Sequence, residues 1–96
     1  MAEWTFLTNH AHVLLCLARD PEMRIRDVAL QVGITERAAQ RIAADLVEAG
    51  YLQRSKDGRR NRYSLNTERP LRHPLESEHA IGEILALLRT PLTADR

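Results

Sequence analysis

Apolar residues recur at helical spacing in several stretches of this chain and alternate with polar residues in one other. The first helical pattern predicts a helix over residues 8–20, with Thr8 or Asn9 as its N-cap and Asp20-Pro21 at its end. Its apolar residues are Ala11, Leu14, Leu15, Leu17 and Ala18. They cover more than one side of the helix, so this helix should lie at the centre of the core or be shared with a second subunit. The preceding Trp4, Phe6 and Leu7 should pack beneath it or on a partner.

A short helix and a sharp turn are predicted next. The helix starts at Arg26 or Asp27 and runs to Gln31, after a short extended stretch over residues 23–25 that could form a single β-bridge. Gly33 can supply the positive φ that a tight turn between helices needs. Thr35 is a good N-cap for another helix, so the two helices should be joined by only a few residues.

This next helix has the clearest periodicity in the chain. It runs to about Ala49 and ends at Gly50, a residue type common just past helix ends. The predicted buried residues are Ala38, Ala39, Ile42, Leu46 and Ala49. The opposite side carries what we call the polar stripe, which consists of Arg37, Gln40, Arg41 and Ala44. A helix with two separated faces should bury one and expose the other.

Two strands, over residues 51–55 and 61–65, should form a β-hairpin. Residues 56–60 connect them, and Asp57-Gly58 is a strong hairpin signal. The inward-facing residues should be Leu52, Tyr63 and Leu65. A linker containing prolines then leads to a last helix over residues 75–89, with Ile81, Ile84, Leu85 and Leu88 at helical spacing.

These elements predict one mainly α domain over residues 1–96 with a small β-hairpin wing, which is a winged helix-turn-helix. Its parts are the first helix (8–20), the helix-turn-helix (26–50), the wing (51–65) and the C-terminal helix (75–89), which we expect to serve in dimerisation.

Charge is distributed unevenly along the chain. The 14 basic and 13 acidic residues give a net charge of +1, yet residues 54–62 hold five cations and one anion. One cysteine, no signal-peptide pattern and no apolar run of membrane-spanning length indicate a cytoplasmic protein without a membrane partner. The sequence has no Gly-rich phosphate loop or nucleophile elbow, so we do not expect an enzyme.

Duplex DNA is the partner that the polar stripe and the wing would suit. Arginine can bond guanine and glutamine can bond adenine in the major groove, which gives Arg37, Gln40 and Arg41 a role in base reading. Amides at Thr35 and Glu36 could hold a phosphate, and the Glu36 carboxylate could accept from cytosine. The alternative is a solvated surface on which Arg41 pairs with Asp45.

The wing carries the second set of candidate DNA contacts. Arg59 or Arg60 could enter a minor groove while Lys56 and Arg62 contact flanking phosphates. The alternative is a solubilising turn that protects an edge strand.

Residues 26–65 resemble the winged-helix transcription regulators of the MarR and ArsR groups. The residues that carry the match are Ala29, Gly33, Ile34, Thr35, Arg41, Leu46, Gly50, Tyr51, Leu52, Asp57 to Arg60, Tyr63 and Leu65. The resemblance implies a recognition helix beginning at Thr35, a wing around Gly58 and a homodimer formed by the terminal helices. The expected dimer contacts are Leu14, Leu17, Ile81, Ile84, Leu85 and Leu88.

The predicted function is therefore sequence-specific binding of double-stranded DNA by a homodimeric transcription regulator, most simply a repressor. The alternatives are a winged-helix protein-interaction adaptor and a nucleoid-type binder without sequence preference. No cofactor or metal is expected, because His10 and His12 are two positions apart on a helix and Cys16 has no second cysteine. Full-length MarR proteins have longer terminal helices around a ligand pocket, and the sequence identifies no small-molecule effector.

Overall fold

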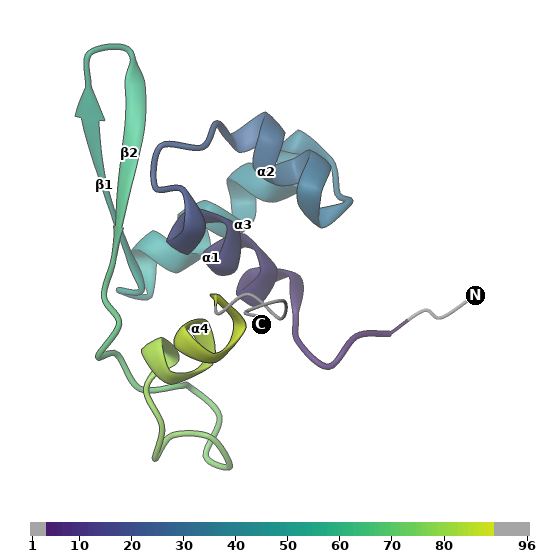
Figure 1. The fold of residues 1–96 in the computed structure, drawn as a ribbon, viewed down its shortest axis with the longest axis vertical. Helices are drawn as coiled ribbons and strands as arrows, with labels where there is room; N and C mark the ends of the chain where they lie inside the picture. The colour runs from purple at the N-terminus through teal and green to yellow at the C-terminus, as the bar shows by residue number, and fades with distance from the viewer. Residues whose placement is uncertain (1–3, 90–96) are drawn as a thin grey trace, which may run out of the picture.

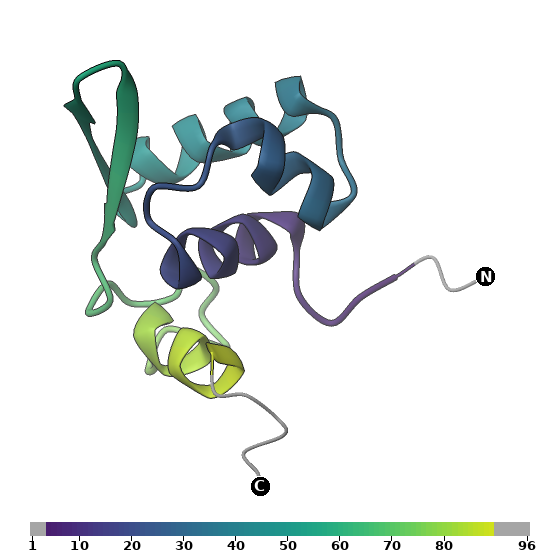
Figure 2. The same cartoon turned by 45° about the horizontal axis from the view of Figure 1, so that its top comes forward.

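Four helices and one β-hairpin make up the computed structural model, which describes residues 4–89 (Figure 1). The elements are α1 (Asn9–Arg19), α2 (Ile25–Val32), α3 (Glu36–Glu48), β1 (Leu52–Asp57), β2 (Arg60–Leu65) and α4 (Ile81–Arg89). Helix α1 lies between the α2–α3 pair and α4, and the hairpin stands along one side of the helices (Figures 1 and 2). This arrangement is a winged helix-turn-helix, so the predicted fold class is confirmed.

Helix α1 is the centre of the core. Thr8 caps it by accepting a hydrogen bond from the Ala11 N–H. Val13 and Leu17 are completely buried, and α1 contacts α2, α3, α4 and β2. Contact with neighbours on several sides explains why apolar residues extend around this helix.

The turn between α2 and α3 forms as expected. Gly33 has a φ of 88°, and the N–H groups of Gly33 and Ile34 both donate to the Ala29 carbonyl. The Thr35 hydroxyl accepts from the Ala38 N–H at 3.0 Å and begins α3. Because these bonds satisfy the free groups at both helix ends, the turn needs only three residues.

The predicted extended stretch over residues 23–25 is correct for Arg24, whose backbone is extended, but wrong for Ile25. Ile25 is already helical, because the N–H groups of Asp27 and Val28 donate to the Arg24 carbonyl and start α2 one residue early. A backbone hydrogen bond from the Tyr63 N–H to the Pro21 carbonyl, at 3.1 Å, ties this loop to the hairpin.

The hairpin is longer than predicted and its loop is shorter. Leu52 pairs with Leu65 and Asp57 with Arg60, so Gly58 and Arg59 alone form the loop. Gly58 has a φ of 69°, and a glycine at the first of two central positions is typical of a type II′ turn. Leu52 and Tyr63 are buried and Leu65 is partly buried, as their alternation predicted.

Helix α4 begins six residues later than predicted. Residues 71–79 instead form a loop that is closed by a bridge between Pro70 and Ala80 and by a bond from the Leu71 N–H to the His79 carbonyl. The Glu83 carboxylate accepts from the Ala80 N–H at 2.9 Å and thereby fixes the helix start. That hydrogen bond, followed by one with His79, lowers the pKa of Glu83.

Four of the six predicted dimer contacts belong to the core of the single chain. Leu14, Leu17, Ile81 and Leu85 are buried there, where α1 packs against α4. Their assignment to a dimer interface stays a prediction, and their burial in the single chain does not favour it. Ile84 and Leu88 are only partly buried. None of the helices within residues 4–89 is long and apolar enough to cross a bilayer.

The N-terminal aromatic residues do not pack beneath α1. Trp4 and Phe6 are exposed and contact each other edge to face, with ring centroids 5.1 Å apart. Only Leu7 of this segment is partly buried.

Candidate nucleic-acid interface

The polar stripe is exposed along its whole length. Helix α3 buries Ala39, Ile42, Ala43 and Leu46 against the core, whereas Ala38 and Ala49 are only half-buried. Arg37, Gln40, Arg41 and Ala44 all face solvent, as do Thr35 and Glu36 at the N-terminal end. The separation of the two faces is the one that the periodicity predicted, with Ala43 added to the buried side.

The arginines of the polar stripe are not neutralised by the described part of the chain. Asp45 was the expected partner of Arg41. Its carboxylate instead lies 3.1 Å from His10 Nε2. Among the carboxylates whose side chains the structure describes, none forms an ion pair with Arg37 or Arg41. Gln40 Nε2 makes one long contact of 3.5 Å with the Glu36 carboxylate. Both guanidinium groups are therefore free to bind an external acceptor.

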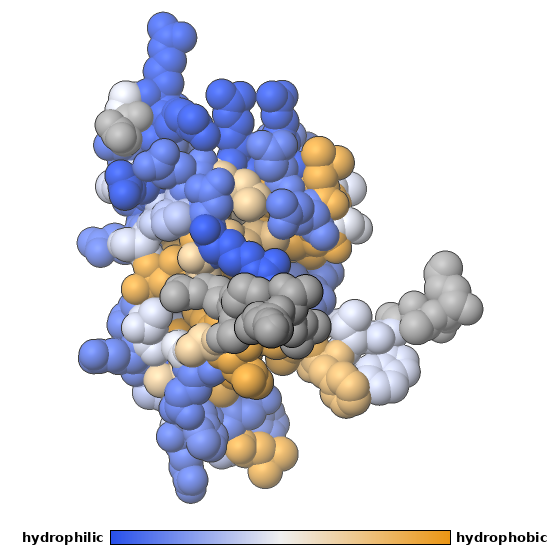
Figure 3. Space-filling view, viewed as in Figure 1, coloured by the Kyte–Doolittle hydropathy of each residue, from blue (hydrophilic) through white to orange (hydrophobic). Residues whose placement is uncertain are grey.

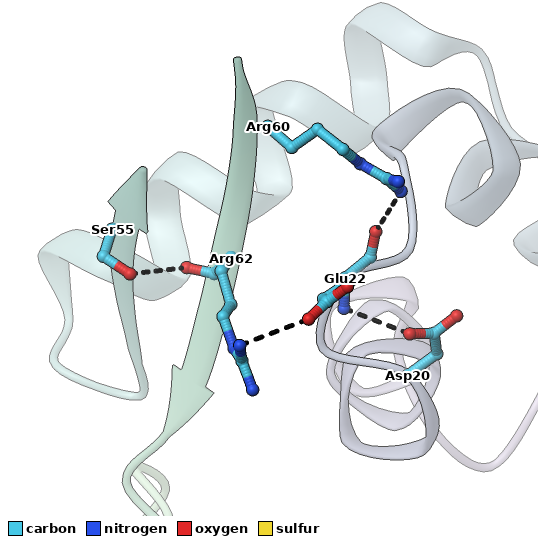
Figure 4. Close-up of polar contacts among 5 residues, drawn as sticks. All are labelled: Asp20, Glu22, Ser55, Arg60 and Arg62. Atoms are coloured by element: carbon cyan, nitrogen blue, oxygen red, sulfur yellow. Dashed lines mark hydrogen bonds and ion pairs between the residues drawn. The ribbon is translucent and has the colours of Figure 1, made fainter. Parts of the chain in front are cut away.

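Two of the wing arginines that were predicted to contact DNA form contacts with another part of the chain. Arg62 Nη1 lies 3.2 Å from Glu22 Oε2, and Arg60 Nη2 donates to the Glu22 carbonyl at 2.9 Å (Figure 4). Glu22 belongs to the loop between α1 and α2, next to the outer edge of β2. This contact could not be predicted from local sequence patterns, because the partners are about 40 positions apart.

The remaining wing cations are exposed and have no ion-pair partner among the described residues. Lys56 and Arg59 were predicted as DNA contacts, but Arg54 was not. Because side chains alternate along a strand, Arg54 and Lys56 share the face of β1 that carries Leu52 into the core. The alternation was visible in the sequence, and it puts Arg54 on the same face of β1 as the predicted contact Lys56. Arg54 could therefore have been added to the candidate DNA contacts.

The wing and the helix-turn-helix occupy the same end of the molecule. The hairpin tip and the α2–α3 pair lie at the top of both ribbon views, with α4 at the bottom (Figures 1 and 2). On the face seen in Figure 3, strongly hydrophilic side chains project from this upper end, over both the wing and the helices. A long polar ligand could therefore meet both elements together.

The candidate metal ligands are separated from one another. His10 pairs with Asp45, and His12 Nδ1 contacts Asn9 Oδ1 at 3.2 Å. Cys16 is buried near Gln31, and burial raises the pKa of its thiol. Over residues 4–89 the structure contains no group of three or more His, Cys, Asp or Glu residues that could hold a metal ion.

Comparison with known proteins identifies the family. The MarR family matches residues 5–61, which is more than half of the chain. The chain belongs to the MarR family. The matched range covers the helix-turn-helix and β1, and it ends at the start of β2.

Among solved structures, the chain is similar to the zinc-dependent MarR family transcriptional regulator AdcR in its Zn(II)-bound state. The two are 25% identical, the match covers 68% of this chain, and the TM-score is 0.49. This chain spans about half of that regulator, since 47% of the latter is covered. No curated protein matches the sequence.

Proposed function

We propose that this MarR-family chain is a sequence-specific DNA-binding transcription regulator that acts as a homodimer and represses its targets. Residues 1–96 would form a single winged helix-turn-helix domain. The observation that carries the proposal is the polar stripe of α3, whose two arginines are exposed and unpaired with any described carboxylate on the second helix of a helix-turn-helix.

The polar stripe would lie in the major groove. Arg37 and Arg41 can each donate two hydrogen bonds to a guanine, and Gln40 can bond an adenine once it leaves Glu36. The amides that follow Thr35 lie at a helix N-terminus, where a phosphate is favoured. Glu36 would then accept from a cytosine amine, or disfavour a duplex that approaches at the wrong position.

The wing would add affinity without reading sequence. Arg54, Lys56 and Arg59 are the exposed cations that are free to neutralise phosphates or enter a minor groove. Of the wing residues predicted from sequence, Arg60 and Arg62 can contribute only if they leave Glu22.

Dimerisation would use the surface of α4 that the core leaves open. Leu87 is exposed, and Ile84 and Leu88 are partly buried, so this helix presents apolar groups beyond those it packs against α1. A two-fold axis would place two copies of α3 on successive major grooves. A dimer seated across two half-sites would exclude other proteins from that DNA, which is the basis for proposing repression.

A selection from random duplexes with the purified protein tests this function. We expect enrichment of a palindromic consensus whose half-sites are about one helical turn apart. A reporter gene with this consensus in its promoter should be transcribed less when the protein is present. Binding with a steep salt dependence but no enriched sequence would indicate a nucleoid-type binder, and absence of any binding would favour a protein-interaction adaptor.

A further inference from the structure

Glu22 contacts the wing through both its side chain and its main chain. Its carboxylate pairs with Arg62 and its carbonyl accepts from Arg60, so one residue engages two arginines of β2 (Figure 4). These arginines alternate with Asn61 along the strand and point to the same face of the hairpin. The contact therefore links the α1–α2 loop to the outer half of the wing.

The loop that carries Glu22 is itself fixed in place. The Glu22 N–H donates to the Asp20 carboxylate at 3.1 Å, and the Met23 N–H donates to the Asp20 carbonyl at 3.0 Å. The neighbouring Pro21 carbonyl accepts from the Tyr63 N–H of β2. Since the backbone on both sides of the ion pair is hydrogen-bonded, Glu22 stays within reach of Arg62.

We propose that Glu22 is a positioning residue that competes with DNA phosphate for Arg62 and so limits binding that does not depend on sequence. This inference rests on the proposed function, since it concerns the same DNA surface. Each phosphate contact made by a cation releases counterions and strengthens binding to every duplex alike. A carboxylate that occupies Arg62 removes one such contact, whereas the base contacts of the polar stripe are unaffected.

The ion pair suits competition because it is accessible to solvent. The Arg62 and Glu22 side chains are 56% and 52% exposed, and exposed pairs contribute little to stability. A phosphate can therefore approach Arg62, but it must replace the carboxylate and meets its negative charge. Arg60 differs, because it bonds a main-chain carbonyl that a change of the Glu22 side chain does not remove.

The experiment measures the salt dependence of binding with four full-length proteins: wild type, Glu22→Gln, Arg62→Gln and the double variant. Each is titrated with a duplex of unrelated sequence and with the selected consensus duplex. Glu78→Gln is the matched control, because it makes the same charge change in the loop before α4, at the opposite end of the molecule from the wing tip (Figure 1). Thermal unfolding of each variant checks that it is folded.

We expect Glu22→Gln to steepen the slope of log K against log salt by about 0.9, the value for one additional phosphate contact. At 0.1 M salt its affinity for the unrelated duplex should rise by up to about eightfold, which is the factor that corresponds to this slope. The ratio of consensus to unrelated affinity should stay unchanged, because the added phosphate contact strengthens binding to both duplexes by the same factor. Arg62→Gln alone should change the slope little, and the double variant should return to the wild-type slope.

Two results would overturn the inference and are distinguishable from failure of the proposed function. If wild type binds DNA and Glu22→Gln has the same slope as Glu78→Gln, then Glu22 does not compete for a DNA contact. If the double variant keeps the steeper slope, then a group other than Arg62 is responsible. Wild-type protein that binds no duplex would overturn the proposed function, and this inference with it.

Discussion

At the scale of single residues, cations that look equivalent in the sequence differ in what they contact. Arg59 and Arg62 are three positions apart in one basic segment, yet only Arg62 is paired with a carboxylate of the described chain. Arg41 was expected to pair with Asp45, but Asp45 contacts His10 instead, so Arg41 has no ion pair with this carboxylate. The environment of each charge, rather than the count of charges, decides which side chains can bind DNA.

Alanine variants at Arg37 and Arg59 should separate base reading from phosphate binding. Arg37→Ala should change which sequences are selected and cost roughly 1–3 kcal/mol on the consensus. Arg59→Ala should weaken binding to all duplexes and reduce the salt slope by about 0.9. Fluorescence anisotropy on consensus and unrelated duplexes over a range of salt concentrations measures both effects. An unchanged selection profile for Arg37→Ala would contradict the assignment of the polar stripe to the major groove.

At the scale of elements, α4 is positioned by a close approach of backbones. A Cβ built on Gly82 would lie 2.7 Å from the Thr67 carbonyl oxygen, to which the Gly82 N–H also donates at 2.9 Å. The Ile81 N–H bonds the Arg69 carbonyl in the same way. These bonds and the bridge at Ala80 end the preceding loop, and they explain why α4 is shorter than its apolar periodicity predicted.

Gly82→Ala should destabilise the protein although alanine favours a helix. Helix propensity alone would add about 1 kcal/mol of stability, but the added methyl group forces α4 away from the 67–69 segment. Overpacking of this kind costs roughly 1–3 kcal/mol, so the free energy of unfolding should fall. Urea denaturation followed by circular dichroism measures it. An increase in stability would show that α4 is not held by this contact.

At the scale of the whole molecule, the single chain uses most of its apolar surface for its own core. Helix α1 packs against α2, α3 and α4 together, which buries residues that the sequence had assigned to a two-fold interface. On α4, Leu87 is exposed and Ile84 and Leu88 are only partly buried. The proposed homodimer therefore depends on a smaller set of contacts than the sequence predicted.

Leu87→Glu should convert the proposed dimer into a monomer. Leu87 is 75% exposed, so a glutamate there leaves the core intact while placing a charge in the interface. Sedimentation equilibrium should give twice the chain mass for wild type and once the chain mass for the variant. Leu30→Glu is the control, because Leu30 is 78% exposed on α2 rather than α4. A monomeric wild type, or a variant that remains dimeric, would refute this interface.

The amino-acid pattern was sufficient to predict the order of the elements, the two faces of α3 and the caps at Thr8 and Thr35. These follow from interactions within a few residues, where periodicity and side-chain hydrogen bonds to the backbone decide the outcome. The exposure of the polar stripe could be predicted for the same reason. Family membership through residues 5–61 agrees with that local pattern.

Contacts between distant parts of the chain are needed to explain which apolar residues form the core, which wing arginines are free and how α4 is held against the preceding loop. Each of these depends on groups far apart in sequence, such as Gly82 with Thr67, α1 with α4, and Arg62 with Glu22. Periodicity shows that a helix has an apolar face but cannot show what that face packs against. Charge counts likewise show an excess of cations without showing which of them meets a carboxylate when the chain folds.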